Sequence, residues 1–287
     1  MQNDWVLMAD DNSDLPAAFF IENEIAVLKM NYIIDGIMYY CGDMPEQDFY
    51  ALLRRGVLPT TTAANIDEIR AVMEPHVKAG KDVLYVAFSS AMSITAEYGD
   101  TAAKQLMEDY PGRQVICVDS LCASLGEGLL IYYVNRLHQE GASMAEVIEW
   151  IMENRLRIAQ VVMADDLMYL QRGGRISKMS AIAGSLIGVK PIIKLDDSGR
   201  LVPFDKARGK KKALTMLVDY LETCVGHSSP DFFMVSHADC IEEAKLLVDM
   251  MKGRFGIDDY LLSFIGPVVG SHTGPGTLGA FIMGEGR

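Results

Sequence analysis

The stretch "VLYVAFSSAMSITAEYGDTAAKQLMEDYPGRQVICVD", residues 83–119, places a helical pattern between two apolar runs. VLYVAF (residues 83–88) and QVICVD (residues 114–119) are short and largely apolar, as strands buried on both faces are. Parallel strands need a crossover connection, and a helix is the usual one. This stretch therefore predicts a β-α-β unit and an α/β fold with a buried parallel sheet.

The segments before this unit continue the alternation of strands and helices. WVLMA (residues 5–9) predicts a first strand. Residues 25–40 predict a hairpin that turns at Asp35-Gly36, because this pair suits a two-residue turn. PEQDFYALLRRG (residues 45–56) predicts a helix, since it begins with proline and ends with glycine.

The pattern changes near residue 158. IAQVVMAD (residues 158–165) predicts a strand, and residues 191–204 predict a hairpin that turns at Asp197-Ser198-Gly199. Amphipathic helices, each closed by glycine, and further strands follow this hairpin. We therefore predict two α/β domains: residues 1–160 form an N-terminal three-layer α/β/α domain with a parallel sheet, and residues 161–287 form a C-terminal domain with a mixed sheet.

Composition excludes several classes of function. The 287 residues include 26 Lys and Arg against 39 Asp and Glu, a net charge of −13, so nucleic acid and anionic membranes are poor partners. No apolar run approaches the ~18 residues of a membrane span, and the N-terminus lacks the pattern of a signal peptide. The five cysteines are scattered, without metal-ligand spacing. We expect a cytoplasmic protein with free thiols, no metal and no cofactor.

The stretch GPGTLG, residues 274–279, matches the G-x-G-x-x-G pattern of dinucleotide-binding loops. That pattern binds a dinucleotide only where it follows a first strand and opens a helix. Too few residues follow Gly279 for a β-α-β unit, so we expect the match to be accidental. No P-loop pattern and no G-x-S-x-G serine motif is present either.

Small polar side chains follow several predicted strands, at the edge where parallel sheets bind ligands. Hydroxyl groups and free backbone N–H groups at helix starts can bind an anion there, although Ser and Thr at such places also serve as ordinary helix N-caps. These residues are Asp10, Asp11, Ser13 and Asp14 after the first strand; Thr60, Thr61 and Thr62 before a helix; Ser89, Ser90, Ser93 and Thr95; and Asp119 and Ser120.

Two basic clusters interrupt the acidic background. QRGGR (residues 171–175) places Arg172 and Arg175 around two glycines, and KARGKKK occupies residues 206–212. Arginine beside flexible glycine suits an anion-binding loop, whereas a solvated turn and a helix start are the alternatives. His272 stands in a glycine-rich segment, where the backbone can approach a ligand closely.

Taken in order along the chain, these stretches resemble the DegV family of fatty-acid-binding proteins. The matching motifs are PTTTA (residues 59–63), SSAMSIT (89–95), Asp119-Ser120, YLQRGGRIS (169–177), VKPII (189–193) and HTGPG (272–276), with ADDNSDLP near the N-terminus. The sequence departs from the family pattern at Ala63, which replaces Gln, and at Ile94, which replaces Gly. We expect these departures to alter head-group geometry or tail preference.

The resemblance implies a long-chain fatty acid held between the two domains. Its carboxylate would be bound by Thr61, Ser93 and Thr62, with His272, Arg172 and Gly274 near the head group or a phosphate added to it. Some bacterial members of the family are the lipid-binding subunit of a fatty acid kinase. The resemblance therefore also implies a partner, a separate ATP-using kinase that forms the acyl-phosphate, while the binding protein itself is not an enzyme.

Two other functions stay open on the residues alone. One is a serine hydrolase or esterase in which Ser93 or Ser120 acts with His272. The other is a regulatory module that binds a phosphate-bearing ligand through the arginine loop around Arg172.

Overall fold

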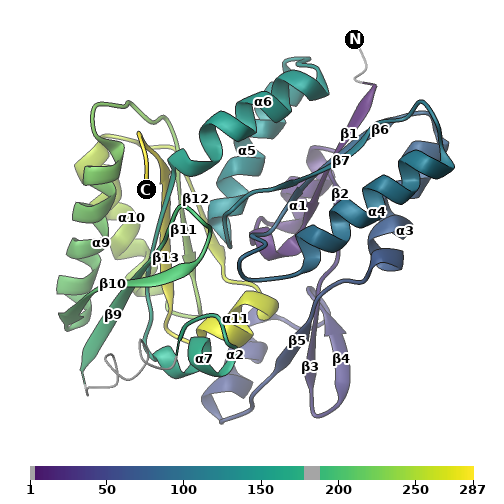
Figure 1. Cartoon of the computed structure of the whole chain (residues 1–287). Coiled ribbons are helices and arrows are strands. Elements are labelled where there is room, and N and C mark those ends of the chain that lie inside the picture. Colours follow the sequence, from purple (N-terminus) through teal and green to yellow (C-terminus); the bar gives the residue numbers. More distant parts are fainter. Residues whose placement is uncertain (1–3, 178–187) are drawn as a thin grey trace.

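The computed structural model describes residues 4–177 and 188–287. Within these ranges the strands form a four-stranded sheet of order β2-β1-β6-β7, a six-stranded sheet of order β10-β9-β8-β13-β11-β12, and a three-stranded sheet of order β4-β3-β5. Figure 1 shows the two larger sheets side by side, with the small sheet below them. The α/β class with one parallel and one mixed sheet is as predicted.

The four-stranded sheet is parallel throughout and forms the centre of three layers. Successive strand residues face opposite layers: Tyr85 packs in the apolar cluster with α3 and α4, whereas Leu84 packs in the cluster with α5 and α6. The predicted β-α-β unit is confirmed. The strands of this sheet are β1 (Trp5–Asp10), β2 (Ala26–Leu28), β6 (Asp82–Ala87) and β7 (Val115–Asp119). The helices of this part of the chain are α1 (Ala17–Glu22), α3 (Ile66–Lys78), α4 (Thr95–Asp109), α5 (Leu125–Gln139) and α6 (Met144–Asn154).

The small sheet is antiparallel and consists of β3 (Asn31–Ile34), β4 (Ile37–Tyr40) and β5 (Thr60–Thr62). Asp35 and Gly36 turn the β3–β4 hairpin with φ of 50° and 81°, the backbone that a two-residue type I′ turn requires. The hairpin is thus confirmed, but it is shorter than predicted. Residues 26–28 form a separate strand, β2, which pairs with β1. The apolar run that was predicted as one strand therefore contributes to two sheets.

The six-stranded sheet is mixed: β11 and β12 are parallel, and the remaining pairs are antiparallel. Helices α9 and α10 cover one face. The predicted boundary between residues 160 and 161 falls inside β8, and the division into domains stays a prediction. The elements are β8 (Ile158–Met163), β9 (Val189–Leu195), β10 (Leu201–Arg208), β11 (Phe233–His237), β12 (Tyr260–Phe264), β13 (Leu278–Met283), α9 (Lys210–Val225) and α10 (Ile241–Phe255).

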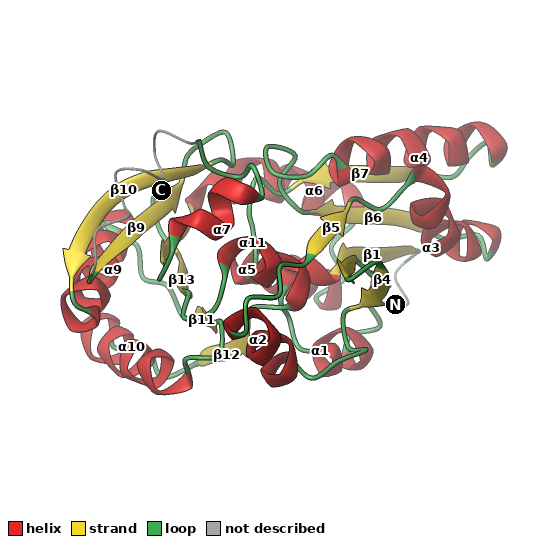
Figure 2. Cartoon of the chain, turned by 90° about the horizontal axis from the view of Figure 1, so that it is seen from below, coloured by secondary structure: helices red, strands yellow, loops and turns green. Residues whose placement is uncertain are grey.

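Helix α5 lies between the two larger sheets, as Figure 2 shows from below. It contacts β1 of the parallel sheet and β8, β11 and β13 of the mixed sheet, so one apolar cluster runs from Leu7 through Leu129 to Phe281. Near the small sheet lie α2 (Glu46–Arg54), α7 (Leu167–Arg172) and α11 (Pro267–Thr273), and two short 3-10 helices, η1 (Asp11–Ser13) and η2 (Arg155–Arg157), complete the described elements. No helix in residues 4–177 or 188–287 is long and apolar enough to cross a bilayer.

Candidate ligand-binding site

A mostly apolar cavity lies where the three sheets meet. Side chains of β8, β9, β13 and α11 line it, among them Val162, Ile193, Phe281 and Val268. Its volume is about 90 Å³, where roughly 10–15 Å³ is enough to hold one water molecule. A cavity with this lining suits an apolar ligand, because burial of apolar surface is favourable and few lining groups need a polar partner.

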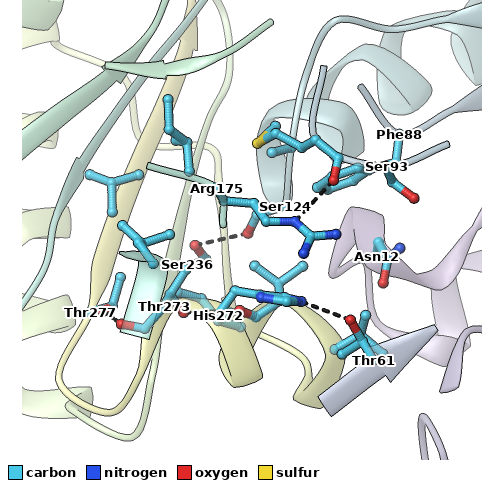
Figure 3. Close-up of a pocket in the computed structure, with 18 of the residues that line it drawn as sticks. Asn12, Thr61, Phe88, Ser93, Ser124, Arg175, Ser236, His272, Thr273 and Thr277 are labelled. Atoms are coloured by element: carbon cyan, nitrogen blue, oxygen red, sulfur yellow. Dashed lines mark hydrogen bonds between the residues drawn. The ribbon is translucent and has the colours of Figure 1, made fainter. Parts of the chain in front are cut away.

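Polar side chains from separate elements meet at one region of this cavity. Thr61 in β5 and His272 in α11 lie 2.8 Å apart, Oγ1 to Nε2, and Figure 3 shows both beside the guanidinium of Arg175. Ser93 belongs to the same lining, from the loop before α4. Hydroxyl, imidazole and guanidinium groups are hydrogen-bond donors, so this set suits an anionic head group.

The environment of His272 keeps its ring neutral. Burial, together with the positive charges of Arg175 and Arg172, lowers the pKa of His272 to about 4. Gly173 allows the ring to lie here, because a Cβ on Gly173 would stand 2.2 Å from His272 Nδ1. Nδ1 is buried and has no hydrogen-bond partner among the described residues.

The two arginines of QRGGR have different surroundings. Arg172 is exposed at the end of α7, and its guanidinium stacks 4.7 Å from the ring centre of Tyr169. Arg175 lines the cavity, and its Nε donates to the carbonyl oxygen of Met92 at 3.0 Å. Partial burial lowers the pKa of the Arg175 guanidinium. The cation that touches the cavity is therefore Arg175, while Arg172 acts on His272 through its charge.

Of the remaining predicted ligands, Ser93 and Thr62 line the cavity and Gly274 does not. Ser93 Oγ lies 2.9 Å from Thr95 Oγ1 and accepts the Thr95 N–H at 3.3 Å, so Ser93 lines the cavity and also bonds to the first residue of α4. Thr62 also lines the cavity, and its hydroxyl donates to Asn31 Oδ1 at 2.7 Å. Gly274 ends α11 with φ of 76°, and a Cβ there would meet the ring of Tyr169 at 2.5 Å.

The two positions where the sequence departs from the family pattern are also located. Ala63 lines the cavity directly after β5, so the small side chain leaves room at that point. Ile94 is 43% exposed and is not among the lining residues.

The hydrogen bonds do not assemble a serine hydrolase site. His272 Nε2 bonds to Thr61, Ser93 Oγ bonds to Thr95, and Ser120 Oγ is buried next to the carbonyl oxygen of Cys122. No carboxylate of a described residue bonds to His272 Nδ1, so the ring lacks the orienting acid of a triad.

Two acidic residues, Asp10 at the end of β1 and Asp14 in the loop after it, bond to other parts of the protein. Asp10 accepts from the Phe88 N–H and the Tyr85 hydroxyl, and its burial raises its pKa to about 6. Asp14 bonds to the Ser124 hydroxyl and accepts the Gly266 N–H at 2.8 Å, and burial raises its pKa to about 8. Asp10 therefore joins the end of β1 to β6, and Asp14 joins the following loop to the starts of α5 and α11.

Several lining residues were not anticipated from the sequence. Asn12, Ser124 and Ser236 lie on the cavity wall (Figure 3). Ser124 Oγ, directly before α5, lies 3.3 Å from Ser236 Oγ in β11 of the mixed sheet. Ser124 has φ of 52°, a strained backbone for a non-glycine residue, which is often found at functional sites. Ser236 is the penultimate residue of β11, and only its place near a strand end was a signal in the sequence.

Comparison with known proteins gives relatives along nearly the whole chain. The family model described as "Uncharacterised protein, DegV family" matches residues 4–285. A DegV domain-containing protein of Clostridium perfringens is 36% identical over 284 residues, which are 98% of each chain. Another, from Streptococcus pyogenes, is 32% identical over 284 residues, again 98% of each chain.

Solved structures of similar fold carry descriptions that name fatty acids. One, described as fatty acid binding of a DegV family protein from Thermus thermophilus, has a TM-score of 0.86 at 25% identity and covers 97% of this chain and 99% of its own. Another, described as DegV, a fatty acid binding protein from Bacillus subtilis, has a TM-score of 0.84 at 27% identity and covers 99% and 100%. On the family match and the identity to the curated relatives, this chain belongs to the DegV family.

Proposed function

We propose that this protein binds a long-chain fatty acid in the cavity between the sheets, with the carboxylate at Thr61, Ser93 and His272. The observation that carries the proposal is the pairing of an apolar cavity with a cluster of donors at one region of its wall. The solved structures of DegV proteins from Thermus thermophilus and Bacillus subtilis, described as fatty-acid-binding, support the same ligand class.

The two parts of the ligand would contribute differently. Each buried CH₂ is worth ~0.8 kcal/mol, so a C16 tail supplies on the order of 10 kcal/mol before ordering costs. The donors around His272 replace the water that a carboxylate loses on burial. Tail burial would therefore dominate affinity, and the head-group contacts would fix the direction in which the lipid enters.

Lipid analysis of the purified protein tests this proposal. The protein is denatured, extracted and examined by mass spectrometry, and the extracted protein is titrated with palmitate and oleate. We expect a co-purified fatty acid and binding of at least one added acid. Recovery of no fatty acid together with no binding of either acid would contradict the proposal.

We further propose that the bound carboxylate is presented to a separate ATP-using kinase, which forms the acyl-phosphate. A carboxylate oxygen would attack the γ-phosphorus of ATP, and ADP would leave. The sequence contains no P-loop pattern to bind that ATP, and Arg172 is exposed beside His272, where added phosphate charge would be stabilised.

The kinase step has its own test. Lipid-loaded protein is incubated with ATP alone and with ATP plus a cell extract from its own organism, and acyl-phosphate is trapped with hydroxylamine. We expect hydroxamate only when extract is present. Hydroxamate from the protein and ATP alone, or none with extract, would contradict presentation to a separate kinase and would leave lipid binding untouched.

A further inference from the structure

A second pocket lies on the other side of the β9–β10 hairpin, between that hairpin, α9 and residues 285–287. In Figure 1 these segments lie together near the C-terminus. The pocket has a volume of about 600 Å³, within the usual range of small-molecule sites.

Strand β9 separates this pocket from the fatty-acid cavity. Ile193 and Leu195 line the cavity, whereas Lys194 between them lines the second pocket. Side chains alternate faces along a strand, so the two spaces lie on opposite sides of the same backbone. The second pocket is therefore distinct from the proposed lipid site.

An aromatic wall forms one side of the second pocket. The pairing register of β10 with β9 shifts between Pro203 and Asp205, which leaves Phe204 in a β-bulge. A bulge redirects the side chain of the extra residue. The Phe204 ring lies 4.8 Å from that of Tyr220 in α9, and Lys194 Nζ lies 5.5 and 5.4 Å from the two ring centres.

Several donors of this pocket have no acceptor among the described residues. Arg287 Nη1 donates to the carbonyl oxygen of Leu121 at 2.8 Å, but Arg287 Nε and Nη2 are buried without a hydrogen-bond partner among the described residues. The buried hydroxyl of Tyr220 likewise has no hydrogen-bond partner among the described residues. Neither Lys194 nor Arg287 forms an ion pair within the part of the chain that the structure describes.

The three acidic side chains of the pocket bond to groups other than Lys194 and Arg287. Asp219 pairs with Arg254 at 2.9 Å, and Glu285 accepts the backbone N–H of His227 at 3.0 Å. Asp205 accepts the N–H of Lys206 at 2.7 Å. Buried donors without acceptors cost free energy, so an acceptor supplied by a ligand would stabilise the pocket.

We propose that this pocket is a second binding site, which takes a small molecule with a carboxylate or phosphate on a flat apolar body. Nε and Nη2 of one arginine form a planar fork that matches two oxygens of such an anion. Lys194 supplies a second positive charge, and Phe204 and Met216 give the apolar body a surface to lie on. The proposal does not depend on which ligand occupies the cavity.

Titration with benzoate, phenyl phosphate and benzyl alcohol tests the site, by ligand-observed NMR on the full chain. We expect benzoate or phenyl phosphate to bind and benzyl alcohol, which lacks the anion, not to bind. The better of the two anions identifies carboxylate or phosphate as the preferred group. Failure of both anions to bind at millimolar concentration would overturn the proposal.

Variants then locate the binding. Lys194→Met keeps apolar contact with the two rings, and Arg287→Gln keeps a polar side chain. Each variant should bind the anion at least tenfold more weakly than the wild type does. Arg200→Gln removes an exposed cation from the turn of the same hairpin and should bind as the wild type does. Wild-type affinity in both Lys194→Met and Arg287→Gln would overturn the proposal, since the anion would then bind elsewhere. Thermal unfolding of Lys194→Met checks that its loss of binding is not loss of fold.

Discussion

The hydroxyl of Thr61 and the imidazole of His272 are 2.8 Å apart, although 211 positions separate them in the chain. This contact joins the small sheet to the helix that leads into β13. The ring is neutral above about pH 4, and with its proton on Nε2 it can donate to Thr61 Oγ1. The Thr61 hydroxyl proton is then free to point at a carboxylate in the cavity.

Replacing Thr61 by valine removes this donor and keeps the shape of the side chain. A hydrogen bond to a charged group is worth ~1.5–3 kcal/mol, so palmitate should bind Thr61→Val roughly ten- to a hundredfold more weakly in a calorimetric titration. Thr60→Val is the matched control, because Thr60 is exposed in the same strand and does not line the cavity. Equal affinity for Thr61→Val and the wild type would remove Thr61 from the head-group site.

Ser93→Ala should change two quantities at once. It removes a proposed carboxylate donor, with a loss of ~1.5–3 kcal/mol in palmitate binding, and it removes the acceptor of the Thr95 N–H, with ~1 kcal/mol less stability in denaturant unfolding. Thr101→Ala is the control on the same helix, since the Thr101 hydroxyl bonds only to the Glu97 carbonyl among described residues. Loss of stability with unchanged affinity would limit Ser93 to its hydrogen bonds with Thr95 at the start of α4.

Gly173→Ala tests the close approach of the arginine loop to His272. The added methyl would lie 2.2 Å from Nδ1, so the ring must move away from Thr61. Since Gly173 has φ of −68°, alanine meets no backbone strain there. We expect palmitate affinity to fall at least tenfold. Gly253→Ala in α10 has no atom within 4 Å of its new methyl and should keep wild-type affinity while gaining ~0.5–1 kcal/mol of stability.

Asp14→Asn should change how stability depends on pH. The folded protein holds the Asp14 proton up to about pH 8, whereas the unfolded chain releases it near 3.8. The folded state therefore binds more protons between these values, and the Asp14 contribution to stability, complete below pH 3.8, is lost as the pH rises towards 8. Asparagine does not titrate and can still accept the Gly266 N–H.

Urea unfolding of wild type and Asp14→Asn at pH 5, 6.5 and 8 measures this difference. The stability of the variant relative to the wild type should rise steadily across the series. Parallel pH curves would mean that Asp14 is already ionised in the folded protein.

Sequence patterns predicted the fold well where periodicity and turn residues agree. The β6–α4–β7 unit and the turn at Asp35-Gly36 are where the residues placed them. No strand was predicted at residues 278–283, which form β13. In the structure this short apolar run is a strand between β8 and β11. Its place depends on contacts with distant strands, which local sequence does not encode.

The candidate site was predictable only in part. Thr61, Ser93 and His272 stood out by residue type in glycine- or hydroxyl-rich stretches, and the structure brings all three to one cavity. Which arginine of QRGGR lines that cavity was not predictable, because the turn at Gly173 and Gly174 decides the direction of each side chain. Arg175 faces inward after that turn, whereas Arg172 remains on the exposed side of α7.

The central place of β13 also sets an order of events during protein synthesis. The strands of the parallel sheet are all made once Asp119 has been added, so that sheet can form while translation continues. β8 and β11 remain apart until residues 278–283 emerge and fill the space between them. The cavity needs Thr277 and Phe281 from this late segment. It therefore comes into existence last, and a nascent chain that already has its first sheet still has no complete ligand site.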